Sequence, residues 1–303
     1  YPKKETQGDS ERILGDWITK KKNRHKVIIA TKISSNHPRG LGATGLKWIR
    51  KGGKNLRFDK KNLIQAVNDS LKRLKTDYID LYQLHWPERN VPIFGQLDYE
   101  HNPKEDKWTP IEEVLENLNN LVKIGKVRYI GLSNETAWGM TKFLYCSEKN
   151  KLTKPISIQN GYNLINRTFD ISNSEVSIRE KCSLVAHSAL AGGLLSGKYL
   201  SGKKPKKSRF TSRRKSFHMH NTKRTERAIK KYLGITKKSG ISLSNLAYAF
   251  VINKPFVASC IIGVTSINQL KNNLKSVNMK LSKEILIDID NIHKSDPNPY
   301  IYI

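Results

Sequence analysis

Tyrosine, lysine and histidine side chains, which together can supply the proton for the reduction of a carbonyl group, occur at Tyr1, Lys32 and His85. Carbonyl reduction requires a hydride and a proton, and a tyrosine can supply the proton only if its pKa falls toward neutrality from about 10. A lysine ammonium beside the phenol favours the phenolate, and an imidazole can donate a hydrogen bond to the substrate oxygen. Each residue alone is a weak signal, because a histidine at a strand end can equally serve the structure. Together they predict a carbonyl-reducing site.

The elements that must position these residues can be read from the apolar pattern. Six runs rich in β-branched residues indicate strands at 26–34, 78–85, 127–134, 156–163, 182–190 and 257–264. Amphipathic stretches with helix-start signals lie between them, one opening at Asp59 and another at Thr109, with Pro110 in its first turn. The alternation predicts a parallel sheet covered by helices, either doubly wound or closed into a barrel.

Polar residues at the strand ends help to choose between these two architectures. The residues that fall at or just past the C-terminal ends of predicted strands are Lys32, His85, Asn134, Gln159 and Ser188. Barrel enzymes build their active sites at that face of the sheet. Two long insertions, 86–108 and the basic segment 201–224, interrupt the alternation, and long loops of this kind tend to be functional. The second insertion can equally be a solvated loop.

The formal net charge is +29 and the pI is about 10.0, which raises the possibility of nucleic-acid binding. Lysines are spread over nearly all the predicted helices, however, and no zinc-finger, RNA-recognition or basic-zipper pattern occurs. We therefore interpret the charge as a compositional bias, and specific nucleic-acid binding is the least favoured alternative.

Three scattered cysteines without a CxxC pair indicate a reducing compartment. No apolar run reaches the length of a membrane-spanning helix, and the first residues do not resemble a signal peptide. These features predict a soluble, cytoplasmic protein.

Two short motifs suggest other chemistry and are rejected on their composition. The segment 192–199, GGLLSGKY, resembles a phosphate-binding loop, but Tyr199 stands where a small hydroxyl must hold magnesium. His218 and His220 could bind a metal, yet no third ligand is close in sequence. We expect neither a nucleotide triphosphatase nor a metal site.

A series of longer segments resembles the aldo-keto reductases, and within them the bacterial Tas-type members. These segments are, in order, IIATKIS, LKRLKTDYIDLYQLHWPER, GKVRYIGLSNET, SIQNGYNLINR, GGLLSGKYLSG and FVASCIIGVTSINQLKNNL. The resemblance covers the whole chain. It implies one (β/α)8 TIM barrel domain over residues 1–303, NADP(H) as cofactor, and reduction of an aldehyde or ketone to an alcohol.

The resemblance also assigns roles to individual residues. Tyr1 would be the proton donor, Lys32 would lower its pKa, and His85 would orient the carbonyl. Contacts with the nicotinamide are implied for Ser133, Asn134 and Gln159, and for His187 at the position that stacks on the ring. Contacts along the pyrophosphate and the ribose are implied for Ser188, Leu190, Gly192 and Lys198. Arg209 would bind a 2′-phosphate, and the adenosine would be bound by Gly263, Thr265, Gln269 and Asn273.

Two departures from the family pattern lead to further expectations. His187 stands where many relatives have a tyrosine that stacks on the nicotinamide, which leaves open a regulatory or redox-sensing barrel that binds NADP(H) but turns over little. The family's first two strands, the helix between them and an aspartate that pairs with the lysine would all precede Tyr1. We therefore expect an N-terminal segment of about 50 residues to be absent from this chain.

Overall fold

The computed structural model describes residues 4–35, 48–50, 56–93, 98–103, 107–206, 208–209 and 222–300. Tyr1, His218 and His220 lie outside the described residues. The chain divides into two compact units. The first consists of Tyr1–Ile158 with Glu180–Cys182, and the second of Gln159–Arg179 with Ser183–Ile303.

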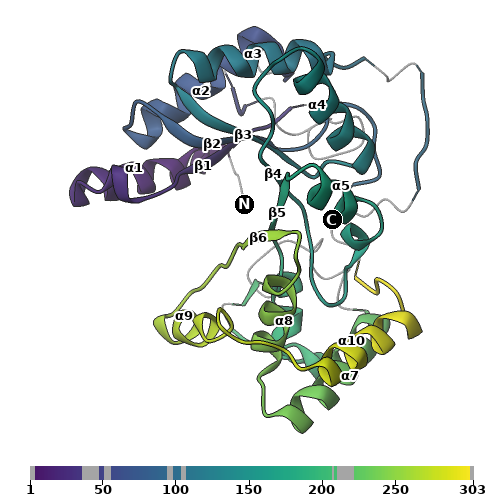
Figure 1. Cartoon of the computed structure of the whole chain (residues 1–303). Helices are drawn as coiled ribbons and strands as arrows, with labels where there is room; N and C mark the ends of the chain where they lie inside the picture. The colour runs from purple at the N-terminus through teal and green to yellow at the C-terminus, as the bar shows by residue number, and fades with distance from the viewer. Residues whose placement is uncertain are drawn as a thin grey trace. The chain divides into compact units, whose positions relative to one another are not determined.

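The first unit is built on three parallel strands that neighbour one another in sequence order: β1 (Ala30–Ile33), β2 (Ile79–Leu84) and β3 (Val127–Ser133). In the register of this sheet, Lys32 pairs with Gln83, and Gln83 pairs with Gly131. Two neighbouring parallel strands must be joined by a long crossover connection, usually a helix. The helices between these strands therefore agree with their parallel direction. Figure 1 shows these strands running side by side.

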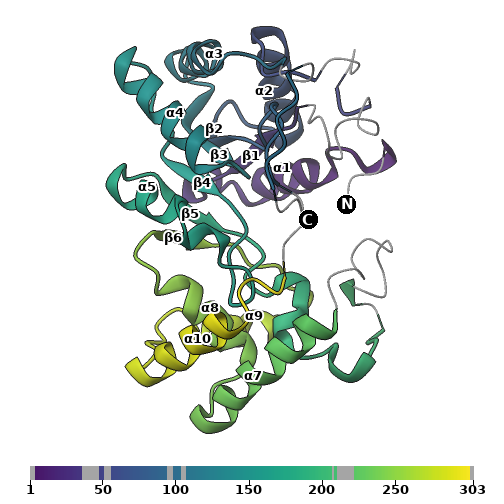
Figure 2. The same ribbon diagram turned by 90° about the vertical axis from the view of Figure 1, so that its right-hand side faces the viewer.

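The described residues of this unit form four helices, together with the 3-10 turns η1 (Lys4–Thr6) and η2 (Arg24–Lys26). The helices are α1 (Asp9–Lys21), α2 (Lys60–Leu74), α3 (Ile111–Lys123) and α4 (Ala137–Lys149). Figures 1 and 2 show α2, α3 and α4 over the same face of the sheet. The α2 residues Leu63, Val67 and Leu71 recur at the i, i+4 spacing and are buried, so this stripe forms part of the core.

One of the two predicted helix starts is confirmed and the other is wrong. Asp59 caps α2 by accepting a hydrogen bond from the backbone N–H of Asn62 at 2.8 Å. Helix α3 does not open at Thr109, because Pro110 occupies the cap position and has no side-chain cap. The Thr109 hydroxyl instead accepts a hydrogen bond from Arg57 Nε at 3.3 Å. The Thr109 hydroxyl, which the sequence pattern assigned to the start of α3, is therefore used in a tertiary contact with Arg57.

The second unit contains the parallel pair β5 (Ser183–Ala186) and β6 (Val257–Cys260), whose register shifts between Leu184 and Val185. The short strand β4 (Ser157–Gln159) contains the point where the units divide. The helices of this unit are α5 (Asn173–Arg179), α7 (Lys223–Ser239), α8 (Leu243–Ile252), α9 (Ile267–Leu274) and α10 (Lys283–Ser295), with 3-10 turns η3 (Thr168–Asp170), η4 (Ala191–Ser196) and η5 (Leu200–Gly202).

An aromatic cluster organises the core of the second unit. The Tyr162 ring stacks on Phe250 of α8 at a centroid distance of 5.7 Å and meets Phe256 edge-on at 5.4 Å. Arg167 pairs with Asp170 and with Asp290 of α10, each at 2.7 Å. The apolar cluster and this ion-pair network together attach α8 and α10 to the segment that follows β4.

The predicted strands are all present, each shorter than its apolar run, and the parallel α/β class is confirmed. A closed barrel is not formed by the described residues, in which β1 has β2 and β6 has β5 as its single strand neighbour. Within the described part of the chain, no helix combines the length and the apolar character needed to cross a membrane.

Candidate active site

Lys32, His85 and Asn134 come from the C-terminal ends of three adjacent strands. The backbone N–H of His85 donates to the carbonyl oxygen of Ile33 at 2.9 Å, which continues the β1–β2 ladder. The Asn134 Nδ2 atom donates to the carbonyl oxygen of His85, also at 2.9 Å. The structure thus brings the ends of β1, β2 and β3 together at one edge of the sheet.

The register also defines which face of the sheet these side chains occupy. Lys32, Gln83 and Gly131 are ladder partners and therefore share a face. Because side chains alternate between the faces, His85 and Ser133, each two residues further along its strand, lie on that same face. The side chains of Lys32, His85 and Ser133 therefore lie on one face of the sheet, near the C-terminal ends of their strands.

The environment of Lys32 is unfavourable for a charge. Burial lowers the pKa of its ammonium below the ordinary value. No carboxylate of the described residues forms an ion pair with it. An acidic partner or a phenol close to Lys32 would relieve this cost.

Asn134 reaches its neighbours through an unusual backbone conformation. Its φ of 52° lies in the left-handed region, which asparagine tolerates better than most residues. The side-chain amide thereby turns back to the His85 carbonyl and also donates to Ser133 Oγ at 3.3 Å. This single residue joins the end of β2 to the end of β3.

Two further polar residues on this face were missed by sequence reasoning. Ser34 Oγ lies 3.0 Å from His85 Nδ1. Gln83 is 0% exposed, and within the described part of the chain neither polar atom of its amide has a hydrogen-bond partner. Ser157 Oγ likewise has no hydrogen-bond partner among the described residues. The alternation of strand side chains, counted two residues on from Lys32 and two back from His85, could have identified both Ser34 and Gln83.

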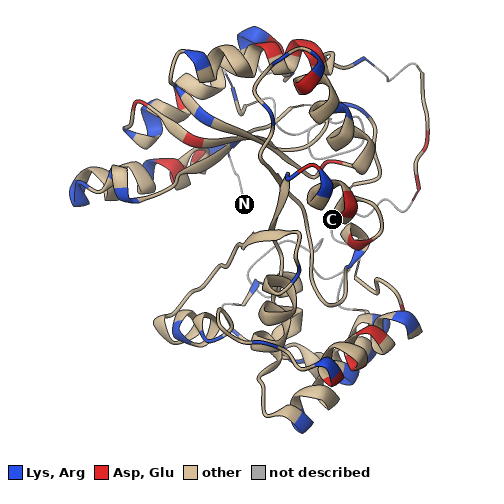
Figure 3. Cartoon of the chain, in the orientation of Figure 1, with Lys and Arg blue, Asp and Glu red and all other residues tan. Residues whose placement is uncertain are grey.

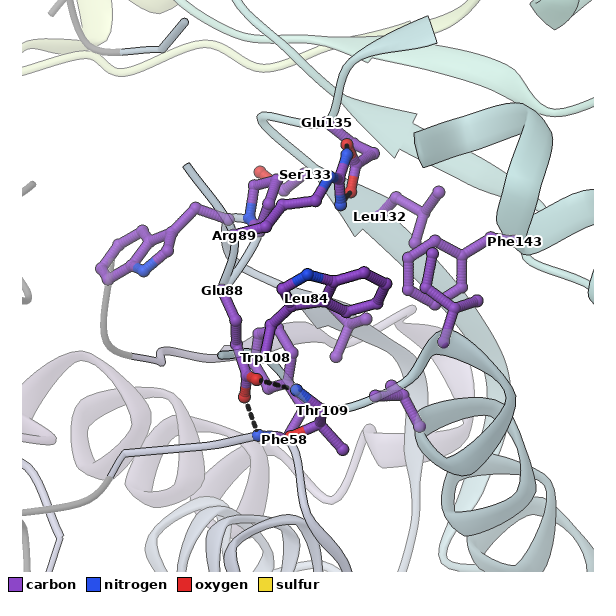
Figure 4. Close-up of a pocket in the computed structure, with 14 residues that line it drawn as sticks. Phe58, Leu84, Glu88, Arg89, Trp108, Thr109, Leu132, Ser133, Glu135 and Phe143 are labelled. Atoms are coloured by element: carbon purple, nitrogen blue, oxygen red, sulfur yellow. Dashed lines mark hydrogen bonds and ion pairs between the residues drawn. The ribbon is translucent and has the colours of Figure 1, made fainter. Parts of the chain in front are cut away.

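The segment after His85 is anchored by a buried carboxylate in a small pocket (Figure 4). Glu88 accepts hydrogen bonds from the backbone N–H of Thr109 at 2.7 Å and from that of Phe58. Burial raises the pKa of Glu88, although these hydrogen bonds and the Arg57 guanidinium oppose the rise. One carboxylate thus ties the segment after β2 to the segments that precede α2 and α3.

A second buried contact links the segments after β2 and β3. Arg89 and Glu135 form a two-pronged ion pair, with Nη1 donating to Oε2 at 3.1 Å and Nη2 donating to Oε1. The side chains are only 10% and 4% exposed. Gly139 of α4 leaves room for the pair, because a Cβ at this position would overlap both side chains.

Removing one partner of this pair is expected to be costly. Glu135→Gln should lower the free energy of unfolding by about 3–5 kcal/mol, because it removes the carboxylate that pairs with the buried Arg89 charge. Urea denaturation measures the change. The matched control is Glu175→Gln in the pair with Arg179, where the side chains are 68% and 74% exposed, and its effect should stay below about 1 kcal/mol. Equal effects of the two variants would contradict a structural role of the buried pair.

The second unit holds the other expected cofactor residues, beginning at the ends of β4 and β5. Gln159 is the last residue of β4. After β5, His187 Nδ1 lies 3.0 Å from Ser188 Oγ, and Asn163 Nδ2 donates to the Ser188 carbonyl oxygen at 3.0 Å. Ser188 has a φ of 60°, so the chain turns sharply directly after the strand.

The glycine-rich segment after β5 forms 3-10 turns. Leu190 precedes η4, and within it Gly192 and Gly193 have φ values of 68° and 102°, which favour glycine. The described residues 197–206 that follow form the turn η5 and no long helix, in contrast to a phosphate-binding loop. Lys198 and Arg209, both in this unit, are exposed.

Around the start of α9, Gly263, Thr265 and Gln269 are exposed, and the Thr265 N–H donates to Gln269 Oε1 at 2.9 Å. Asn273 is different, because it is buried and its Nδ2 lies 3.5 Å from the Tyr248 hydroxyl of α8. Among the described residues there is no cluster of three or more potential metal ligands.

The parallel strands and the helices between them define an α/β protein, and enzymes of this class build their sites at the carboxyl edge of the sheet, where these polar residues lie. The model of the aldo/keto reductase family matches residues 1–294, and the chain belongs to this family. It is 40% identical to Protein tas of Escherichia coli over 97% of this chain and 82% of that protein. It is 30% identical to the uncharacterized oxidoreductase YrpG of Bacillus subtilis, over 94% and 78% of the two chains. A probable voltage-gated potassium channel subunit beta of Oryza sativa is 28% identical over 97% and 80%. Family membership supports an oxidoreductase activity.

Proposed function

We propose that the protein reduces an aldehyde or ketone to an alcohol with NADPH. The observation that carries this proposal is the position of Lys32, His85 and Asn134 at the C-terminal ends of three adjacent parallel strands, with Asn134 bonded to the His85 carbonyl oxygen. In this assignment Tyr1 gives the proton to the carbonyl oxygen, the Lys32 ammonium lowers the pKa of Tyr1, and His85 orients the carbonyl. NADPH, when bound, supplies the hydride.

Several residues fit such a cofactor by their chemistry. Asn134 has an amide that could orient a nicotinamide carboxamide, and its conformation is already held by His85 and Ser133. In the second unit, Lys198 and Arg209 expose cationic side chains suited to phosphate groups. The positive φ of Gly192 and Gly193 is compatible with close approach of the backbone to a ligand.

We also propose that the family barrel is completed by an upstream segment that carries two strands and an aspartate. Three observations support this. The described residues give β1 and β6 one strand neighbour each. On β3, Tyr129 is 53% exposed, and Ile28, just before β1, is 83% exposed. Lys32 is partly buried and its described surroundings include no ion-pair partner. Added strands would pair with the free edges of β1 and β6 and would cover Tyr129 and Ile28, and the aspartate would pair with Lys32.

The cofactor choice can be tested at Arg209. We expect Arg209→Ala to lower the affinity for NADPH while leaving that for NADH nearly unchanged, because only NADPH has a 2′-phosphate that a guanidinium can bind. The ratio of the two affinities should fall about tenfold, the effect of one charge-assisted contact. Fluorescence titration of both cofactors measures it. An unchanged ratio would remove Arg209 from the cofactor site.

A second candidate is an NADP(H)-binding regulatory barrel with little turnover. It is favoured by His187 in place of a stacking tyrosine and by the similarity to a probable channel subunit. Steady-state NADPH oxidation with a panel of aldehydes separates the two functions, because a regulatory barrel would bind the cofactor without turnover.

In Figure 3, lysines and arginines occur on helices of both units rather than on one element. This distribution favours the interpretation of the positive charge as a compositional bias over a surface that binds nucleic acid.

A further inference from the structure

We propose that Ser34 is a positioning residue for His85. Its hydroxyl would donate a hydrogen bond to Nδ1 of the imidazole and thereby keep the imidazole proton on Nε2, the nitrogen that donates to the carbonyl oxygen of the substrate. Ser34 Oγ lies 3.0 Å from His85 Nδ1, which is a normal hydrogen-bond distance. The inference rests on the proposed function, in which His85 contacts the substrate.

The sheet itself brings the two side chains together. Ile33 and Leu84 are ladder partners, and the N–H of His85 donates to the Ile33 carbonyl oxygen at 2.9 Å. Ser34 and His85 are therefore the next residues along two adjacent parallel strands, and their side chains lie on the same face. Their contact follows from the strand register and does not depend on a long flexible side chain.

The imidazole is also supported by its neighbour in sequence. The rings of His85 and Trp86 have a centroid distance of 4.3 Å with an interplanar angle of 33°. Trp86 is 6% exposed, and its Nε1 donates to the carbonyl oxygen of Ser35 at 2.9 Å. The segments after β1 and β2 are thus joined twice, once through each ring, which limits the orientations open to His85.

The tautomer of His85 decides what the ring can do. A neutral imidazole has one N–H donor and one acceptor nitrogen, and the hydrogen bond at one nitrogen determines where the proton resides. A carbonyl oxygen only accepts, so the nitrogen facing it must carry the proton. A serine hydroxyl can donate or accept. With a carbonyl oxygen at Nε2, the consistent arrangement has Ser34 as donor and Nδ1 as acceptor.

The test combines nitrogen NMR with kinetics on protein that carries the proposed upstream segment. In wild type, the ¹⁵N shifts of His85 should report a proton on Nε2, and in Ser34→Ala they should report a mixture of tautomers. We expect kcat of Ser34→Ala to fall about tenfold, the effect of roughly one hydrogen bond, with unchanged NADPH affinity. Ser34→Thr keeps the hydroxyl and should restore both the tautomer and most of kcat.

Ser35→Ala is the matched control. Ser35 is the next residue, is 0% exposed, and its Oγ has no hydrogen-bond partner within the described part of the chain. Its removal should leave the His85 shifts and kcat unchanged. A wild-type imidazole with its proton on Nδ1 would overturn the inference without any variant. So would a Ser34→Ala protein with wild-type shifts and kcat, provided that His85→Gln abolishes turnover. Full turnover in His85→Gln would overturn the proposed role of His85 as well.

Discussion

Lys32→Met is expected to reduce the rate of carbonyl reduction by about 10²- to 10⁴-fold, the contribution typical of positioned acid–base groups. Methionine has a similar length but no charge, so the phenol of Tyr1 would return toward its ordinary pKa of about 10 and would transfer its proton less readily. Steady-state NADPH oxidation with an aldehyde measures the loss. Binding of NADPH, followed by fluorescence, should change little, because the effect lies in the chemical step.

Lys72→Met provides the control for this substitution. Lys72 belongs to α2 and is exposed, whereas Lys32 is partly buried at the end of β1. The control should keep wild-type turnover. Wild-type turnover in Lys32→Met would refute the assigned role, and a loss of NADPH affinity as large as the loss of kcat would indicate that Lys32 acts in cofactor binding.

If the proposed upstream segment completes the barrel, residues 1–303 produced alone are expected to aggregate and to lack reductase activity, whereas addition of the proposed segment should restore a cooperative thermal transition and NADPH turnover. The physical reason is that, among the described strands, β1 and β6 each have a single neighbour and so leave one edge of the sheet unpaired. Each buried backbone group without a hydrogen-bond partner costs about 1–3 kcal/mol. The summed cost of a few such groups therefore exceeds a typical total stability of about 5–15 kcal/mol.

The groove beside β6 gives this prediction a local readout. Within the second unit it is lined by apolar residues of α8, β6 and α9, including Ile252, Val257 and Leu274. Amide hydrogen exchange in β6 should slow when the upstream segment is present, because a new strand would pair with it. An equally long glycine–serine extension should have no such effect. Monomeric, cooperatively melting and fully active protein from residues 1–303 would show that Tyr1 has been misassigned.

Local sequence patterns predicted the elements because each strand and helix start depends mainly on nearby residues. The β-branched runs located each strand that the structure describes, and the Asp59 cap located the start of α2. The same local reasoning failed at Thr109, where Arg57 and Glu88, both distant in sequence, take the hydroxyl and the N–H that a helix start would have used. The strand ends were also overestimated, and at β6 the reason is that Ile261 and Ile262 continue the apolar run past Cys260, the last residue of the strand.

The sequence by itself determined the parallel α/β class, the order of the strands along the chain and the residue types at their carboxyl ends, since these follow from hydrophobic periodicity. Only the tertiary structure decided that Ser34 contacts His85, that Asn134 turns back to the His85 carbonyl, and that Arg89 pairs with Glu135. These partners lie 51, 49 and 46 residues apart in the chain. A pattern of period two or 3.6 carries no information over such separations, and the strand register and the side-chain rotamers that create the contacts are set by packing.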